Sequence, residues 1–324
     1  MNKQRLYFTH TRDAYGFKEG AKNFPLMVVV AMSYVCNARC PNCPYTQSTI
    51  RQSYKGRPFI RPETFKRIAD ECGRFRSYMR LSGGGEPFLL PYLITLIEYA
   101  KSAGAKVGII TNGSRLTPRA ASRLLAADTD TIEVSVDAAD KETYSRIRVG
   151  LDFDALVASV MYLREERDVT RSKTRIVASV VNQKALGDKL SDTVAFWAKI
   201  VDKVQVRKFL TWSIGDSKQS ADPSPYLSER VPCPFPFERL NIDTRGDIAF
   251  CGYDIVGETN FGNVHETSIE AVWKGEKFNA WRKLLLEGRY EEIPVCQKCS
   301  DWRYRSWNYN YWKVLNDADG MRDE

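Results

Sequence analysis

The stretch Cys36-Asn37-Ala38-Arg39-Cys40-Pro41-Asn42-Cys43 places three cysteines in one short segment with the spacing C-x3-C-x2-C. Three thiolates this close together can hold three irons of a cubane cluster and leave the fourth iron open to a small molecule. The alternative is a structural zinc knuckle, which needs a fourth Cys or His nearby. No further Cys or His lies between Thr11 and Glu71. The spacing therefore favours a cluster with an open iron.

Apolar, β-branched segments alternate with helix-like segments on either side of this loop. Strands are predicted at 26–32, 78–82, 106–111, 131–136, 175–181 and 203–210, and helices at 62–75, 91–103, 118–127, 153–167 and 188–200. Near-continuous apolar strands that alternate with helices predict an α/β fold with a parallel sheet covered by helices. Six such units make a partial (β/α)6 TIM-like barrel. The cysteine loop follows the first strand, at the edge where parallel barrels carry their chemistry.

A glycine-rich loop, Ser82-Gly83-Gly84-Gly85-Glu86-Pro87, follows the second predicted strand. Successive glycines let the backbone approach a ligand closely, and the Glu86 carboxylate can accept hydrogen bonds from an ammonium group. At the end of the fourth strand, Ser135 and Asp137 have the reach to bond ribose hydroxyls. Asp137 is equally suited to cap the helix that begins near Asp140.

Together these motifs resemble the signature of the radical S-adenosylmethionine (radical SAM) enzymes. The resemblance implies that SAM binds the open iron and is cleaved reductively to a 5′-deoxyadenosyl radical, which abstracts hydrogen from an unactivated C–H bond. It also implies a six-unit barrel and a reductant such as flavodoxin or ferredoxin as a partner. One position departs from the family pattern: Asn42 stands where many members have an aromatic residue.

The same resemblance assigns cofactor-binding roles to residues at the strand ends. It implies that Gly84, Gly85 and Glu86 contact the amino group of SAM, and that Arg148 pairs with its carboxylate. The remaining predicted cofactor-binding residues lie at the barrel mouth: Thr111, Asn112, Ser135 and Asp137. Arg207, near the end of the sixth predicted strand, is a candidate for holding substrate.

Four further cysteines, Cys233, Cys251, Cys296 and Cys299, have the spacing C-x17-C-x44-C-x2-C. On spacing alone they fit structural zinc or a fully ligated iron–sulfur cluster. The segment 242–251 predicts a tight hairpin that leads into a ligand, and helices are predicted at 269–273 and 278–286. This arrangement resembles the twitch domain, the single-cluster form of the SPASM domain. It implies an auxiliary [4Fe-4S] cluster, and thus two [4Fe-4S] clusters in the chain.

The segment after Trp212 is irregular and rich in proline, which is typical of a linker. The predicted organisation is an N-terminal extension (1–25), the radical SAM barrel (26–212), a linker (213–232), an auxiliary-cluster domain (233–300) and a C-terminal tail (301–324).

Within this group, the cysteine spacing is most similar to that of the 2-deoxy-scyllo-inosamine dehydrogenases, which oxidise an aminocyclitol alcohol. The resemblance implies a radical SAM oxidoreductase of antibiotic or other specialised-metabolite biosynthesis. It would abstract hydrogen from a carbinol C–H of a sugar, aminocyclitol or glycoside, pass an electron to the auxiliary cluster and form a ketone. The catalytic base is not identified by any motif.

Two other functions remain open at this stage. A radical SAM epimerase of a sugar or glycoside needs a hydrogen-atom donor, and Cys72 is the only cysteine outside the two sets. Its position on the 68–72–75 helix face indicates a small buried hydrophobe instead. A peptide or protein maturase is the third function, although only four cysteines follow the barrel and about 25 residues precede it.

Composition limits the partners and the location. The 324 residues carry a formal net charge of +8, which is not gathered in a basic helix, so no nucleic-acid partner is expected. The longest apolar run is too short to span a bilayer, and no secretion signal is recognisable, so no membrane partner is expected. A cluster with an open iron needs a reducing compartment, which predicts a cytoplasmic location.

Overall fold

The computed structural model describes residues 21–48, 50, 58–212, 219–222, 224, 227–255 and 257–304. Residues 1–20 of the predicted N-terminal extension and residues 305–324 of the predicted tail lie outside this part of the chain. Nine residues of the predicted linker, 213–218, 223 and 225–226, also lie outside it.

Six parallel strands form the barrel, and each pairs with the next one along the chain. They are β1 (Met27–Ala31), β2 (Tyr78–Ser82), β3 (Lys106–Thr111), β4 (Thr131–Ser135), β5 (Arg175–Asn182) and β6 (Lys203–Lys208). The predicted α/β fold with a partial parallel barrel is confirmed, and the strand bounds differ from the predicted ones by two residues at most.

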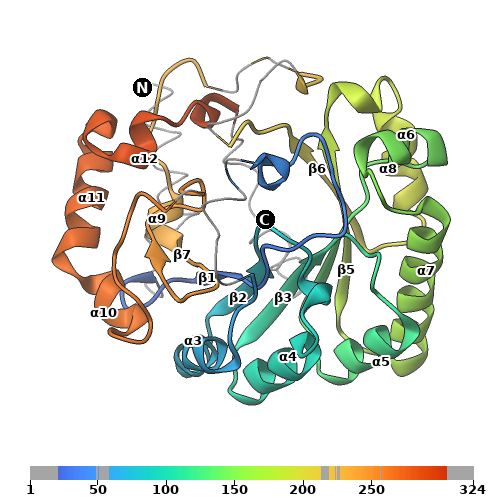
Figure 1. The fold of residues 1–324 in the computed structure, drawn as a ribbon, viewed down its shortest axis with the longest axis horizontal. Coiled ribbons are helices and arrows are strands. Elements are labelled where there is room, and N and C mark those ends of the chain that lie inside the picture. The colour runs from blue at the N-terminus through green and yellow to red at the C-terminus, as the bar shows by residue number, and fades with distance from the viewer. Residues whose placement is uncertain are drawn as a thin grey trace, which may run out of the picture.

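Helices cover the outside of the curved sheet (Figure 1). They are α3 (Pro62–Arg74), α4 (Leu93–Ser102), α5 (Pro118–Ala126), α6 (Lys141–Ile147), α7 (Phe153–Thr170) and α8 (Leu190–Trp197). Proline begins both α3 and α5, where its missing N–H has no helical partner to lose. The short α6 is the helix that the sequence places near Asp140. Its N-cap is Asp140, whose carboxylate accepts a hydrogen bond from the Thr143 N–H at 2.9 Å.

Cys72 faces the apolar core from α3. Its side chain has no exposed surface, and it packs with Phe65 and Ile68 against the strands. Burial raises the pKa of this thiol well above its usual value. Cys72 therefore packs as a small apolar side chain in this fold.

The barrel sheet continues into the C-terminal part of the chain. Strand β7 (Arg239–Ile242) pairs in parallel with β1, and β8 (Ile248–Ala249) pairs antiparallel with β7. The sheet thus has eight strands in the order β6-β5-β4-β3-β2-β1-β7-β8. The predicted hairpin is confirmed, whereas its pairing with β1 was not predicted, because parallel pairing of distant segments leaves no local pattern in the sequence.

Beyond the hairpin, short helices lie at the left of Figure 1. They are α10 (Ile269–Lys274), α11 (Glu276–Leu286) and α12 (Pro294–Gln297), with α9 (Phe235–Glu238) preceding β7. Phe250, at the end of the hairpin, lies 5.0 Å from the ring centroids of both Phe278 and Trp281. These contacts hold the segment that contains Cys251 against α11.

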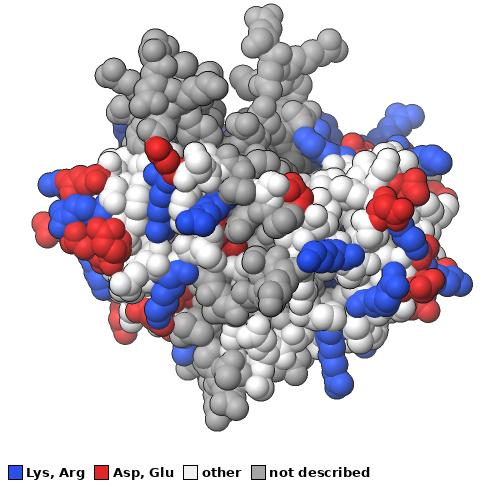
Figure 2. Space-filling model, turned by 90° about the horizontal axis from the view of Figure 1, so that it is seen from above, with Lys and Arg blue, Asp and Glu red and all other residues white. Residues whose placement is uncertain are grey.

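Five 3-10 turns complete the described elements: η2 (Pro44–Thr46), η3 (Pro87–Leu89), η4 (Lys184–Leu186), η6 (Tyr290–Glu292) and η7 (Asp301–Tyr304). On the face drawn in Figure 2, Lys and Arg side chains lie among Asp and Glu side chains toward both flanks. None of the described helices is long and apolar enough to cross a membrane.

Candidate functional site

The first cysteine loop leaves the C-terminal end of β1 and brings three thiols together. The Cys43 N–H donates to the Cys40 carbonyl at 3.1 Å, and the Ala38 N–H lies 3.4 Å from Cys36 Sγ. Burial raises the pKa of Cys43 to about 11, and the neighbouring Cys40 and Cys36 thiolates add to this rise. Three thiolates in one place are stabilised when iron binds them, so the donor set fits a cluster.

Glu86 is buried beside this loop and is held by three protein donors. Its Oε1 accepts hydrogen bonds from Thr111 Oγ1 at 2.7 Å and from the Phe88 N–H at 3.1 Å, while Oε2 accepts one from the Asn112 N–H at 2.7 Å. Burial raises the pKa of Glu86. A carboxylate oxygen can accept two hydrogen bonds, so Oε2 keeps an acceptor position for an ammonium group.

Asn112 connects this carboxylate to the cysteine loop. Its side-chain nitrogen donates to Asn37 Oδ1 at 3.0 Å and lies 3.9 Å from Cys36 Sγ. The structure therefore brings Glu86, Thr111, Asn112 and the first cysteine into one network. This is the arrangement expected if the end of β3 positions a cofactor over the loop.

Gly84 and Gly85 pack directly against the cysteine loop. A Cβ at Gly84 would lie 2.3 Å from the Tyr45 ring, and a Cβ at Gly85 would lie 2.2 Å from the Val35 carbonyl oxygen. The Glu86 N–H also donates to the Val35 carbonyl at 2.8 Å. Side chains are excluded here because Gly84 faces the Tyr45 ring and Gly85 approaches the Val35 backbone.

Asp137 and Arg148 contact each other beneath the cysteine loop. Arg148 Nη2 lies 2.6 Å from Asp137 Oδ2, and Arg148 Nη1 lies 3.9 Å from Cys40 Sγ. The other Asp137 oxygen accepts a hydrogen bond from the Val181 N–H at 2.7 Å. The helix cap falls to Asp140, as described above. The predicted SAM contacts of Asp137 and Arg148 remain predictions, as does that of Ser135, which ends β4 opposite Ser179.

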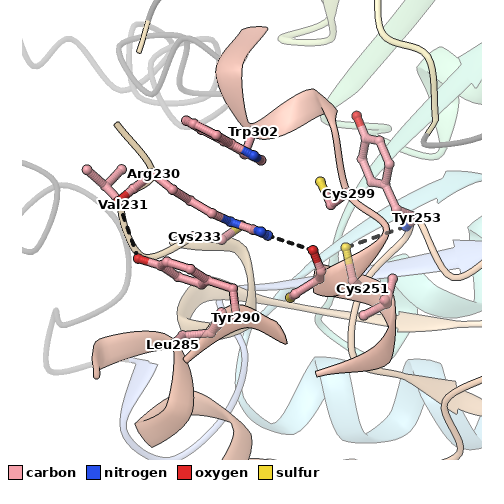
Figure 3. Close-up of a pocket in the computed structure, with 11 residues that line it drawn as sticks. Arg230, Val231, Cys233, Cys251, Tyr253, Leu285, Tyr290, Cys299 and Trp302 are labelled. Atoms are coloured by element: carbon pink, nitrogen blue, oxygen red, sulfur yellow. Dashed lines mark hydrogen bonds between the residues drawn. The ribbon is translucent and has the colours of Figure 1, made fainter. Parts of the chain in front are cut away.

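The other four cysteines line one small cavity of about 30 Å³ in the C-terminal part. Cys233, Cys251, Cys296 and Cys299 all contribute to its wall, and Figure 3 labels the first, second and fourth of them. Burial raises the pKa of Cys296, and Cys251 and Cys233 add to this rise. Among the described residues, no three Cys, His, Asp or Glu side chains surround a point as ligands of a single metal ion. A cubane differs from such a site, because each cysteine binds a separate iron.

A larger cavity of about 310 Å³ lies between the barrel mouth and the β7–β8 hairpin. Tyr34 and Tyr45 of the first cysteine loop form one part of its wall. Cys251 and Tyr253 form another part, and both residues also line the small cavity. This space therefore lies beside both cysteine sites, where a substrate would have access to each.

Charged residues from three barrel strands meet below this cavity. Arg80 on β2 and Arg207 on β6 both pair with Glu133 on β4, and both arginines line the cavity. Burial opposes ionisation of Glu133, but the two guanidinium groups outweigh it and lower its pKa. Arg207 was a predicted substrate contact, whereas Arg80 and Glu133 were missed. The available signal was a charged residue inside an otherwise apolar strand.

Comparisons with known proteins assign a family to this architecture. Residues 30–179 match the model of the radical SAM superfamily, and residues 233–300 match that of SPASM, an iron–sulfur cluster-binding domain. Together with the parallel barrel, these matches define a radical SAM enzyme, a class that uses a [4Fe-4S] cluster and SAM. The chain is a radical SAM enzyme with a C-terminal SPASM domain, a type of domain that binds auxiliary iron–sulfur clusters.

Similar proteins act on different substrates. The mycofactocin maturase MftC of Mycobacterium tuberculosis is 32% identical over 140 residues, which cover 43% of this chain and 34% of the maturase. The match thus spans about a third of that relative. BtrN, solved in complex with AdoMet and 2-DOIA, has a TM-score of 0.52 at 19% identity, covering 85% of this chain and 92% of BtrN.

A third similar protein, SuiB of Streptococcus suis, was solved bound to its precursor peptide SuiA. It has a TM-score of 0.64 at 15% identity, covering 87% of this chain and 71% of SuiB. The two structural likenesses support the fold.

Proposed function

We propose that this enzyme removes a hydrogen atom from a residue of a peptide or protein and oxidises that residue, with an auxiliary cluster as the electron acceptor. One observation carries the proposal. Cys251 and Tyr253 line both the large cavity and the four-cysteine cavity, so a substrate in the first would lie next to the second. When bound, the first cluster with SAM supplies a 5′-deoxyadenosyl radical, and the auxiliary cluster accepts one electron.

The residues of this chain position the reactants. Cys36, Cys40 and Cys43 would hold the first cluster, and Glu86 would accept a hydrogen bond from the SAM ammonium through the free position on Oε2. Thr111 and Asn112 fix the Glu86 carboxylate in place. Cys233, Cys251, Cys296 and Cys299 would hold the auxiliary cluster with no open iron. Such a cluster is suited to electron transfer rather than to substrate binding.

The overall balance is a two-electron oxidation of the substrate. One hydrogen atom leaves the substrate carbon for the 5′-deoxyadenosyl group, one electron goes to the auxiliary site, and one proton is released. Arg80 and Arg207, on the cavity wall, are suited to orient carbonyl or carboxylate oxygens of the substrate.

The substrate class is proposed from the relatives and the size of the cavity. MftC is a maturase, and it is 32% identical over 140 residues, whereas BtrN is 19% identical over 85% of this chain. A cavity of about 310 Å³ lies in the size range of ligand pockets and accommodates one amino-acid side chain with adjacent backbone. The cavity is compatible with either substrate class, and the similarity to a maturase supports proposing a peptide or protein before the sugar or aminocyclitol expected from the sequence.

Oxidation of a small polyol is the second candidate. It is supported by the single set of four C-terminal cysteines and by a cavity that also accommodates a cyclic alcohol. The epimerase alternative has less support. It needs a thiol beside the substrate, and Cys72, the only cysteine outside the two sets, lies in the apolar core.

The two candidates are separated by the origin of the abstracted hydrogen. Reconstituted enzyme, SAM and a reductant are incubated with extract from host cells grown in deuterated medium, and 5′-deoxyadenosine is analysed by mass spectrometry. We expect deuterium transfer from the macromolecular fraction of the extract, and loss of this transfer after protease treatment. Transfer from the small-molecule fraction that resists protease would overturn the peptide proposal in favour of polyol oxidation.

A further inference from the structure

Arg230 lies at the four-cysteine cavity and precedes its first cysteine by three residues. Its guanidinium donates to the Cys296 carbonyl at 2.8 Å. It is placed between two aromatic rings, with its Cζ 4.4 Å from the Tyr290 centroid and 5.8 Å from the Trp302 centroid. Figure 3 shows the guanidinium pointing toward the cysteines from between these rings.

Arg230 is also the one charged side chain among the described residues that line this cavity. The rest of the described wall is aromatic, aliphatic or thiol, and no described carboxylate forms an ion pair with Arg230. Aromatic faces hold a guanidinium through cation–π attraction without cancelling its charge. The positive charge therefore acts on the cysteine site with little compensation from the protein.

A cluster bound by four thiolates becomes more negative when it is reduced. A nearby cation stabilises the reduced form more than the oxidised form, and the effect is large where the walls are apolar. Net charge, hydrogen bonds and solvent exposure are the factors by which proteins set cluster potentials. Arg230 supplies the first of these factors at this site.

We propose that Arg230 is a positioning residue that raises the reduction potential of the auxiliary cluster, so that the cluster accepts the substrate's electron. The inference rests on the proposed function, because it requires Cys233, Cys251, Cys296 and Cys299 to hold that cluster. The rings of Tyr290 and Trp302 keep the guanidinium over the site, and the Cys296 carbonyl fixes its orientation.

Lys298 provides a matched control. It lies next to Cys299 in the sequence, yet it is exposed, does not line the cavity, and pairs with Glu258 at 2.6 Å. Lys298→Gln and Arg230→Gln each remove one positive charge near the same cysteines. Only the second removes a charge that faces the cavity.

The experiment is a redox titration followed by electron paramagnetic resonance. It uses the full-length chain with Cys36, Cys40 and Cys43 replaced by Ala, so that only the auxiliary cluster contributes a signal. We expect Arg230→Gln to move the midpoint potential to more negative values, Arg230→Lys to move it less, and Lys298→Gln to leave it unchanged, all with equal iron content. Equal potentials for Arg230→Gln and Lys298→Gln would overturn the inference.

A second variant is needed if the protein with Arg230→Gln does not retain its auxiliary iron. Trp302→Leu keeps the positive charge but removes one of the two rings, and it should shift the midpoint in the same negative direction. An unchanged potential in Trp302→Leu would then contradict the role of Arg230. Absence of iron from the background chain would instead refute the auxiliary cluster, and with it the proposed function.

Discussion

The two cysteine sites have similar parts but opposite electrostatic balance. Each has a backbone N–H near a sulfur, from Ala38 to Cys36 at 3.4 Å and from Tyr253 to Cys251 at 3.5 Å. Each also has an arginine. Arg148 lies 2.6 Å from the buried carboxylate of Asp137, whereas Arg230 lies between the rings of Tyr290 and Trp302.

At each site, the side chain that contacts the arginine determines whether its positive charge is cancelled. Asp137 cancels the charge of Arg148, and the buried Glu86 adds a further carboxylate beside the first loop. The aromatic rings at the second site leave the charge of Arg230 in place. Under the proposed function, this balance would favour a lower potential at the first site, where reducing power would be needed, and a higher potential at the second, where the electron would be taken up.

Removal of the first cluster has the largest expected effect. The triple change Cys36→Ala, Cys40→Ala and Cys43→Ala should abolish formation of 5′-deoxyadenosine, because no iron remains to bind SAM. Of about eight irons in the wild type, about four should remain at the second site. Iron analysis and chromatography of the nucleoside measure both results. Cys72→Ala is the control and should keep full iron content and turnover, and loss of iron in this control would contradict the assignment of the clusters.

Loss of the second cluster should leave the first half of the reaction intact. Cys251→Ala should still form 5′-deoxyadenosine but should lose the oxidised product, because the substrate radical has no electron acceptor. Product is measured by mass spectrometry against the nucleoside formed in the same sample. Full product yield in this variant would show that the second site is not the acceptor.

Asp137→Asn tests the charge balance at the first site. Without the carboxylate, the Arg148 charge acts on Cys40 uncompensated, so the potential of the first cluster should rise and SAM cleavage should slow. Breaking a buried ion pair should also lower the free energy of unfolding by about 3 kcal/mol. Asp140→Asn is the matched control, since asparagine caps a helix about as well as aspartate. An unchanged potential in Asp137→Asn would remove the contrast between the two sites.

Glu86→Gln should weaken SAM binding while leaving the iron content unchanged. A hydrogen bond to a charged partner is worth about 1.5–3 kcal/mol, which corresponds to roughly a 10- to 100-fold increase in Kd. Isothermal titration calorimetry with the reconstituted protein measures this change. If the affinity stays at the wild-type value, Glu86 does not contact the ammonium group.

The smallest expected effect is a pH dependence of SAM affinity. Burial raises the pKa of Glu86, so this carboxyl takes up a proton at a higher pH than an ordinary glutamate with a pKa of about 4.3. A protonated carboxyl no longer attracts the ammonium group, and SAM affinity should therefore fall as the pH falls toward this raised value. The fall should be absent in Glu86→Gln, and an identical pH profile in both proteins would assign it to another group.

Much of this architecture could be predicted from local pattern. The alternation of apolar strands with helices predicted the six barrel strands, and the segment 242–251 predicted the β7–β8 hairpin. Cysteine spacing predicted two separate groups, and the four C-terminal cysteines do line one cavity. These features depend on neighbours in the sequence, which is why a single sequence shows them.

The features that were missed depend on contacts between distant segments. The pairing of β1 with β7 joins residues such as Met27 and Arg239, and no local periodicity encodes it. Arg230 lies in an irregular segment without a motif, so only its packing between Tyr290 and Trp302 distinguishes it from a solvent-exposed arginine. Asp137 and Arg148 were each predicted to bind SAM, and their mutual ion pair became visible only once β4 and α6 were placed.

The ladder between β1 and β7 also affects how the protein is made. β1 is among the first described segments to be synthesised, but its partner on one side lies some two hundred residues later in the chain. At roughly 5–20 residues per second, that edge of β1 stays unpaired for about ten seconds or more. Its exposed N–H and C=O groups invite association with other chains during this time. The sheet is thus completed late in synthesis, and chaperones that cover nascent strand edges should raise the yield of the enzyme.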